Sequence, residues 1–246
     1  MAHLPDSRPI DDDDPSGLTD RDLSEPIRRE LGPVPLTILG ETASRAQLEL
    51  APGDIVWACR GAIMAYHDGS RWGRRVCGGT FKRSLDDEGA SLTSFEADRP
   101  GTILLAAGDR GRIAIWDLAH GPIIAARDSI LGAWGNPIEI TVAYRSDAAS
   151  LSDTGLVLYR ISGSGQVLIH GRHDFDEREL ARGQSMRHIS GSLAAFSGSI
   201  AYGVRKFGGR AREPFGKGLF RIHLAGPGRV LLHTRRRRVL LHPPSG

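Results

Sequence analysis

Three tandem copies of one short pattern constrain the fold of this 246-residue chain more than any other feature of its sequence. The pattern opens with LAPG, which ends at Gly53, and it recurs as LAHG ending at Gly121 and as LARG ending at Gly183. Twelve and thirteen positions after each glycine stand an alanine and an aromatic residue; the aromatic residues are Tyr66, Trp134 and Phe196. Self-similarity at a fixed period is the signature of repeated structural units.

A second glycine element recurs in phase with the first. RPGTILL, GSGQVLI and GPGRVLL surround Gly101, Gly165 and Gly228, which follow the first glycines by 48, 44 and 45 residues. The period between successive copies is 62 to 68 residues. The spacing predicts three units over about residues 46–109, 110–174 and 175–238.

The units are predicted to consist of β-strands. Their apolar runs are short and are bounded by Gly, Pro, Asp and Ser, and no longer stretch in the repeated region holds helical periodicity. LFRIHLAGPGRVLLHT, from Leu219, and GLVLYRISGSGQVLIHG, from Gly155, predict a β-hairpin at the end of a unit, with glycine supplying positive φ at the turn. One such unit cannot cover its own apolar face. We therefore expect one all-β domain over residues 34–238 with internal pseudo-threefold symmetry.

The two ends of the chain differ from this domain in composition. Residues 1–33 are rich in Pro, Asp and Ser and predict a disordered acidic leader, and residues 239–246 predict a flexible tail. Residues 1–35 hold nine acids against four arginines, a balance of −5, which leaves +8 on the remainder of a chain with net charge +3. Two cysteines, no secretory leader and no 18-residue apolar window favour a cytoplasmic protein.

The repeated segments LELAPGDIVWACRGAIMAY, GPIIAARDSILGAW, ARGQSMRHISGSLAAF and GKGLFRIHLAGPGRVLLHTR carry a family resemblance. Over about residues 36–235 the chain resembles the altered-inheritance-of-mitochondria twenty-four family. The resemblance implies three units similar to the tryptophan RNA-binding attenuation protein fold, a short double-stranded β-helix, and a tendency to form homo-oligomers. Eukaryotic members are associated with mitochondrial inner-membrane organisation, and bacterial members have no assigned reaction. Lys217 stands where a family member often carries an acid, and no catalytic residue is transferred.

The sequence contains no convergent catalytic or metal-binding set. Cys59 matches Arg127 and Ile189 in the other units, which indicates a structural residue. Cys77 has two arginines before it, which could stabilise its thiolate, but its surroundings are typical of a solvent-exposed loop cysteine. No His-x-His pair occurs. His170 and His233 are at equivalent positions of two units, where the first unit has Ala106, which predicts a tolerant exposed position. Neither a Gly-x-Ser-x-Gly elbow nor a phosphate-binding loop is present. We therefore predict no catalytic residue, no metal and no cofactor.

The leading prediction is a non-enzymatic scaffold or interaction protein that forms a homo-oligomer and presents loops to a protein partner. One alternative is binding of RNA or another polyanion, because basic stretches with interleaved aromatic residues allow phosphate contact and base stacking. A second alternative is association with an anionic membrane surface. The candidate polyanion-binding residues are Arg71, Arg74, Arg75, Arg205, Lys206, Arg210, Arg212, Arg235, Arg236, Arg237 and Arg238. We also expect the acidic leader to mask this basic body.

Overall fold

The computed structural model describes residues 34–40, 43–59, 61–73, 92–106, 111–146, 156–206 and 220–234. All described residues belong to one compact unit, Leu31–Gly246. The predicted leader and tail lie outside the described residues, as do Cys77 and Lys217.

The described residues form mostly β-strands, which confirms the predicted all-β fold class. Strands of the first predicted repeat, and β1 before it, are β1 Leu36–Leu39, β2 Arg45–Leu50, β3 Ile55–Cys59, β4 Ile63–Tyr66, β5 Ser70–Gly73, β6 Leu92–Ala97 and β7 Gly101–Ala106. The second repeat contains β8 Ile113–Asp117, β9 Ile123–Ala126, β10 Ile130–Arg145 and β11 Val157–His170. The third contains β12 Phe175–Leu180, β13 Ser185–Ile189, β14 Leu193–Ser197, β15 Ala201–Lys206, β16 Phe220–Ala225 and β17 Gly228–His233. Three short 3₁₀ turns are η2 Leu118–His120, η3 Arg127–Ser129 and η5 Ser190–Ser192.

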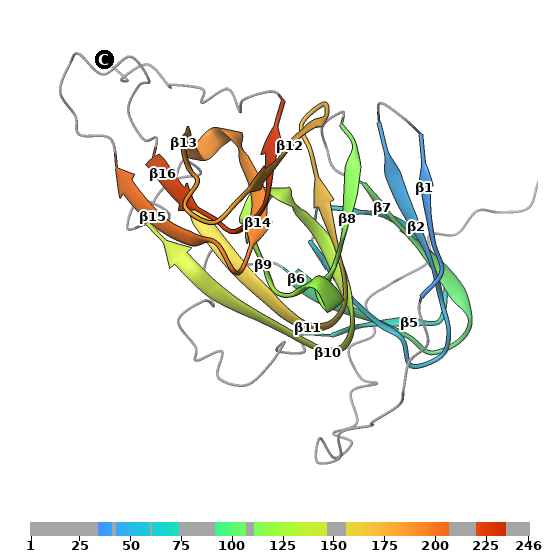
Figure 1. Ribbon diagram of the computed structural model, residues 1–246. Coiled ribbons are helices and arrows are strands. Elements are labelled where there is room, and N and C mark those ends of the chain that lie inside the picture. The colour runs from blue at the N-terminus through green and yellow to red at the C-terminus, as the bar shows by residue number, and fades with distance from the viewer. Residues whose placement is uncertain are drawn as a thin grey trace, which may run out of the picture. The chain divides into compact units, whose positions relative to one another are not determined.

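The strands form three sheets. A ten-stranded sheet has the order β12-β17-β14-β9-β11-β10-β3-β6-β5, with β8 also paired to β11. A four-stranded sheet has the order β1-β2-β7-β4, and a three-stranded sheet has the order β13-β16-β15. Figure 1 shows β1 and β2 at the right of the picture and β13, β15 and β16 at the left.

Strand pairings recur from unit to unit. The first strand of each repeat pairs antiparallel with its last, as β2 with β7, β8 with β11 and β12 with β17. The last strand also pairs with the strand that carries the Ala-aromatic pair, as β7 with β4, β11 with β10 and β17 with β14. In the second unit the long β10 and β11 each replace two strands of the other units. The division into three units and their pseudo-threefold symmetry stay predictions.

The predicted hairpins at the ends of the units are wrong. β16 and β17 are consecutive in the chain, but β16 pairs with β13 and β15 while β17 pairs with β12 and β14. The Gly-Pro-Gly element is thus a corner between two sheets. In the second unit the corresponding segment is the single strand β11, in which Gly165 has φ 151°. A Cβ on Gly165 would lie 2.0 Å from the Trp134 carbonyl oxygen, so glycine is required by the close approach of β10.

Three apolar cores hold the sheets together. The first core lies between the four-stranded sheet and the ten-stranded sheet, and Phe95 and Leu48 are fully buried in it. The middle core is lined only by the ten-stranded sheet and η2, and includes Ile123 and Ile161. The third core lies between the ten-stranded and three-stranded sheets and includes Phe196. Each unit therefore depends on its neighbour to cover its apolar face.

Candidate interaction surfaces

The end strand β4 exposes apolar side chains that the other two units bury. Met64 is 57% exposed and Tyr66 is 47% exposed, although the Tyr66 ring contacts Phe95 edge-to-face at 5.3 Å between centroids. The corresponding aromatic residues Trp134 and Phe196 are 3% and 0% exposed. The difference arises because β10 and β14 each have a second strand beside them, whereas β4 stands at the end of its sheet order. Exposed large apolar side chains on an end strand make β4 a candidate interaction site.

The solvent face of the three-stranded sheet is basic. In β16 the side chains alternate, so that Phe220, Ile222 and Leu224 enter the third core while Arg221 and His223 are exposed. The same alternation exposes Arg187 on β13 and Arg205 on β15. The sequences of these three strands contain no Asp or Glu.

The register brings the basic side chains of this face together. Arg205 lies directly opposite Arg221, and His223 lies between Arg187 on one side and Gly203 on the other. Side chains directly opposite each other on one sheet face have Cβ atoms about 5 Å apart, and like charges placed so destabilise the sheet. A bound anion would relieve that repulsion. We call Arg187, Arg205, Arg221 and His223 the basic face.

The predicted polyanion-binding residues separate in the structure. Arg205 and Lys206 lie at the end of β15, next to the rest of the basic face. Arg71 lies on β5, where its guanidinium forms an ion pair with Asp98 at 2.7 Å. The remaining predicted residues, Arg74, Arg75, Arg210, Arg212 and Arg235 to Arg238, lie outside the described residues. The sequence reasoning missed Arg187, Arg221 and His223, which the alternation in SMRHI and FRIHLA could have indicated.

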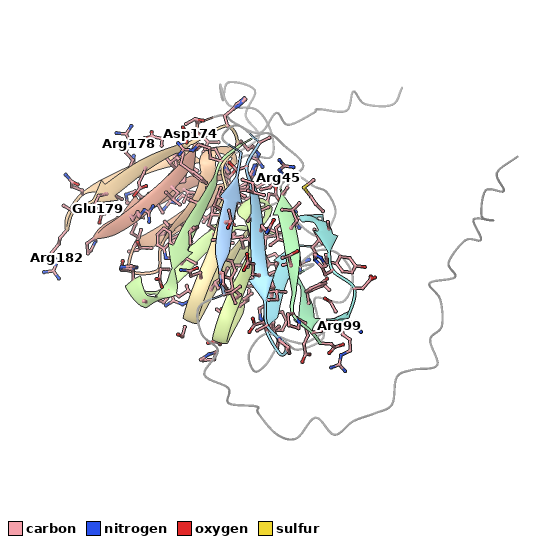
Figure 2. The ribbon with its side chains drawn as sticks, turned by 90° about the vertical axis from the view of Figure 1, so that its right-hand side faces the viewer. Arg45, Arg99, Asp174, Arg178, Glu179 and Arg182 are labelled. Atoms are coloured by element: carbon pink, nitrogen blue, oxygen red, sulfur yellow. The ribbon has the colours of Figure 1, made fainter. Side chains whose placement is uncertain are left out.

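The neighbouring strand β12 provides a contrast, because its charges are mixed. Figure 2 shows Arg178, Glu179 and Arg182 pointing outward from this part of the molecule. Arg178 is hydrogen-bonded to Asp176 at 2.9 Å, and this bond and the negative charge of Asp176 raise the pKa of Arg178. An arginine already held by a carboxylate is less available to a phosphate. Arg178 is therefore a suitable control for the arginines of the basic face.

The repeat anchors have the structural roles expected of turns and packed strands, with one shift. Gly53, Gly121 and Gly183 have φ of 90°, 106° and 85°, so all three are in conformations that favour glycine. Tyr66 and Phe196 lie opposite Ile103 and Val230, each two residues after the second anchor glycine of its unit. Trp134 lies opposite Gln166, one residue after Gly165. In the second unit the strand partner of the aromatic residue is therefore displaced by one residue relative to the other two units.

The expectation that His170 and His233 are exposed is wrong, because both side chains are buried. The Nδ1 atom of His233 accepts a hydrogen bond from the backbone N–H of Arg172 at 3.1 Å, which leaves Nε2 to donate to the Ser129 hydroxyl at 3.1 Å. Burial, together with smaller effects of Arg172 and His170, lowers the pKa of His233 to about 3, against an opposite effect of the negative charge of Asp128. Protonation of Nδ1 would place its N–H against the backbone N–H of Arg172, so that two hydrogen-bond donors would face each other. This cluster links the second and third units as a neutral structural contact.

Cys59 and the other titratable groups form no metal site within the described ranges. The thiol of Cys59 is half-buried at the end of β3 and packs against the first core. No three His, Cys, Asp or Glu side chains of the described residues come together in a way that could hold a metal ion. Among those residues there is also no helix long and apolar enough to span a membrane.

The fold and surfaces define the class of protein: an all-β chain of tandem units joined by strand pairing, with one open apolar strand and one basic sheet face. The sequence model of the family described as Mitochondrial biogenesis AIM24 matches residues 36–235. The chain therefore belongs to the AIM24 family.

Structural comparison supports the same fold. The crystal structure of protein SPYM3_0169 from Streptococcus pyogenes is similar to this chain with a TM-score of 0.68 and 16% sequence identity. The alignment covers 82% of this chain and 94% of that one, which shows a shared fold. No curated protein matches the sequence.

Proposed function

We propose that this protein is a non-enzymatic interaction protein that self-associates through its β domain. The observation that carries the proposal is the exposed apolar strand β4, whose counterparts in the other two units are buried against a neighbouring strand. Covering Met64 and Tyr66 with a second protein surface would remove apolar area from water, at about 25 cal/mol for each Å² buried. Strand edges with apolar side chains readily accept a further strand.

The test is the mass of the purified protein in solution. Native mass spectrometry and light scattering at micromolar concentration should both report an oligomer. The Met64→Lys variant should shift the equilibrium towards the monomer, because it places a charge on the exposed strand. Ile115→Lys is the matched control, since Ile115 is also exposed, at 41%, on β8. A monomer at every concentration would refute self-association.

A second candidate function, binding of a polyanion, is favoured by the basic face. Arg205 and Arg221 supply two planar guanidinium groups from adjacent strands, which suits the oxygens of a phosphodiester. Binding of a labelled single-stranded RNA should weaken steeply with salt, and the salt slope should fall by about one for each arginine removed. Arg205→Ser and Arg221→Ser should lower affinity, whereas Arg178→Ser should not. Vesicles containing anionic lipid form a parallel arm of the assay. Binding of vesicles but not of RNA would assign the face to a membrane surface.

A further inference from the structure

The strand β15 is an open edge of the basic face. It stands at one end of the β13-β16-β15 sheet, and among the described strands only β16 pairs with it. Figure 1 shows β15 at the left of the picture, outside β16. Gly203 and Arg205 are exposed on this strand, and a Cβ on Gly203 would meet no atom within 4 Å. The edge therefore has room for a further strand.

The register shows which backbone groups of β15 point outward. The N–H of Gly226 donates to the Gln184 carbonyl at 2.9 Å, next to the first residue pair of the β13–β16 ladder. Successive residues of a middle strand bond alternately to its two neighbours, so the preceding position of β16 bonds to β15, where it lies opposite Ala201. Tyr202 and Val204 then direct their N–H and C=O groups away from β16.

The core side of this edge is apolar and is held to the other sheet. Tyr202 and Val204 are partly buried and pack on the third core. The Tyr202 hydroxyl donates to the Ala143 carbonyl of β10 at 3.0 Å, and its ring contacts Phe196 edge-to-face at 5.3 Å between centroids. A side chain placed beside Val204 would extend the third core. An edge that is already ordered lowers the entropic cost of binding a partner.

The solvent side of the same edge carries basic side chains. Arg205 lies opposite Arg221, and Gly203 lies opposite His223. Arg205 takes part in none of the ion pairs between described residues, and the sequences of the three strands contain no Asp or Glu. Complementary charge is what selects a partner for such a surface. The edge therefore favours a partner that carries carboxylates or other anions.

We propose that β15 binds an extended acidic segment of another protein as a fourth, antiparallel strand of the β13-β16-β15 sheet. The segment has the pattern acid–apolar–acid, because its side chains alternate between the basic face and the third core. This inference rests on the anion binding proposed above for the basic face and names the partner. A nucleic acid would use the basic side chains but not the outward N–H and C=O groups of Tyr202 and Val204, which an extended peptide matches.

The alternation of the ladder sets the place of each partner side chain. The apolar residue lies opposite Val204 and exchanges backbone hydrogen bonds with it. The two acids lie opposite Gly203 and Arg205, in pairs without backbone hydrogen bonds, where Cα atoms are about 4.5 Å apart. One carboxylate can thus meet the Arg205 guanidinium directly. The other faces the open position at Gly203, beyond which His223 lies on β16.

A fluorescein-labelled peptide with the core Glu-Val-Glu-Val-Glu tests the pairing by fluorescence anisotropy. A scrambled peptide, Glu-Glu-Val-Val-Glu, has the same composition without the alternation. A third peptide is N-methylated at both valines, which keeps its charge but removes the N–H groups that would face Tyr202 and Val204. The alternating peptide should bind the full chain about tenfold or more tightly than either control, since each lost pair of backbone hydrogen bonds costs about 1 kcal/mol or more.

Two protein variants locate the peptide on the sheet. Arg205→Ser should weaken binding of the alternating peptide by about tenfold, because it removes a charge-assisted contact. Arg187→Ser is the matched control, since Arg187 lies on β13, at the opposite edge of the same face, and its loss should change the affinity little. Circular dichroism and thermal unfolding establish that both variants are folded before binding is measured.

The outcomes separate this inference from the anion binding on which it rests. Equal binding of the three peptides, or an equal loss in Arg205→Ser and Arg187→Ser, would refute strand addition at β15. If no peptide binds but a labelled single-stranded RNA binds and is weakened by both substitutions, the basic face binds a polyanion and the peptide partner is refuted. If neither the peptides nor the RNA bind, both proposals are refuted.

Discussion

The partly buried His188 makes the stability of this protein depend on pH in a way that one substitution should reveal. His188 lies on β13 opposite Ile222, and burial lowers its pKa from 6.5 to about 4, opposed weakly by a hydrogen bond with the Ile189 carbonyl. Its Nε2 atom is buried with no hydrogen-bond partner among the described residues. The unfolded chain binds a proton at this residue below pH 6.5, whereas the folded chain does so only below about pH 4. Stability is therefore lost as the pH falls from 6.5 towards 4.

The magnitude follows from the two pKa values. At pH 5 the unfolded histidine is stabilised by protonation by about 2 kcal/mol, since each unit between pH and pKa is worth about 1.4 kcal/mol, and the folded histidine gains almost nothing. His188→Leu removes this linkage and also removes a buried polar nitrogen. Urea unfolding at pH 7.5 and pH 5, at one fixed protein concentration, should show that the variant loses about 2 kcal/mol less stability than the wild type over this range. An equal loss in the two proteins would refute the assignment of His188 as a neutral buried group.

The other predictions use single substitutions and unfolding or binding measurements. His233→Gln should likewise reduce the loss of stability between pH 7.5 and pH 5, because the pKa of His233 is about 3 in the folded chain; an unchanged pH profile would contradict its burial as a neutral acceptor. Phe196→Ala should cost about 3–5 kcal/mol of unfolding free energy, whereas Tyr66→Ala at the matching repeat position should cost about 1 kcal/mol in the monomer, as judged by urea denaturation. Equal costs would contradict the open position of β4. Gly165→Ala should destabilise the fold by about 3 kcal/mol or more, because its Cβ would overlap the Trp134 carbonyl, and Gly191→Ala, which meets no atom within 4 Å, is the control.

Short apolar runs in the sequence predicted the β-strands of the fold but not how these strands combine. Short apolar runs between glycines indicate strands, and the positive φ of Gly53, Gly121 and Gly183 explains why these positions recur. The hairpin predicted for LFRIHLAGPGRVLLHT was wrong because local sequence shows a turn but not which strands lie on either side of it. In this fold consecutive strands enter different sheets, so their partners come from distant parts of the chain.

Burial was also hard to predict at the ends of strands. His170 and His233 occupy a position that is Ala106 in the first unit, which suggested tolerance. The structure buries both histidines, and His233 is satisfied by Ser129, 104 residues away in the chain. The one-residue shift of Trp134 relative to Tyr66 and Phe196 is already present where the ladder begins, because Ile130 stands nine residues after its anchor glycine whereas Ile63 and Leu193 stand ten residues after theirs. The basic face could have been predicted from alternation within β13 and β16, but not the register that sets Arg205 opposite Arg221.

Light scattering over a range of protein concentrations tests the central claim, self-association through the exposed strand β4, most directly. The wild type and the Ile115→Lys variant on β8 should both have a mass above that of the monomer, whereas the Met64→Lys variant on β4 should approach the mass of the monomer. The same mass for the wild type and Met64→Lys, or a monomeric wild type, would contradict the claim.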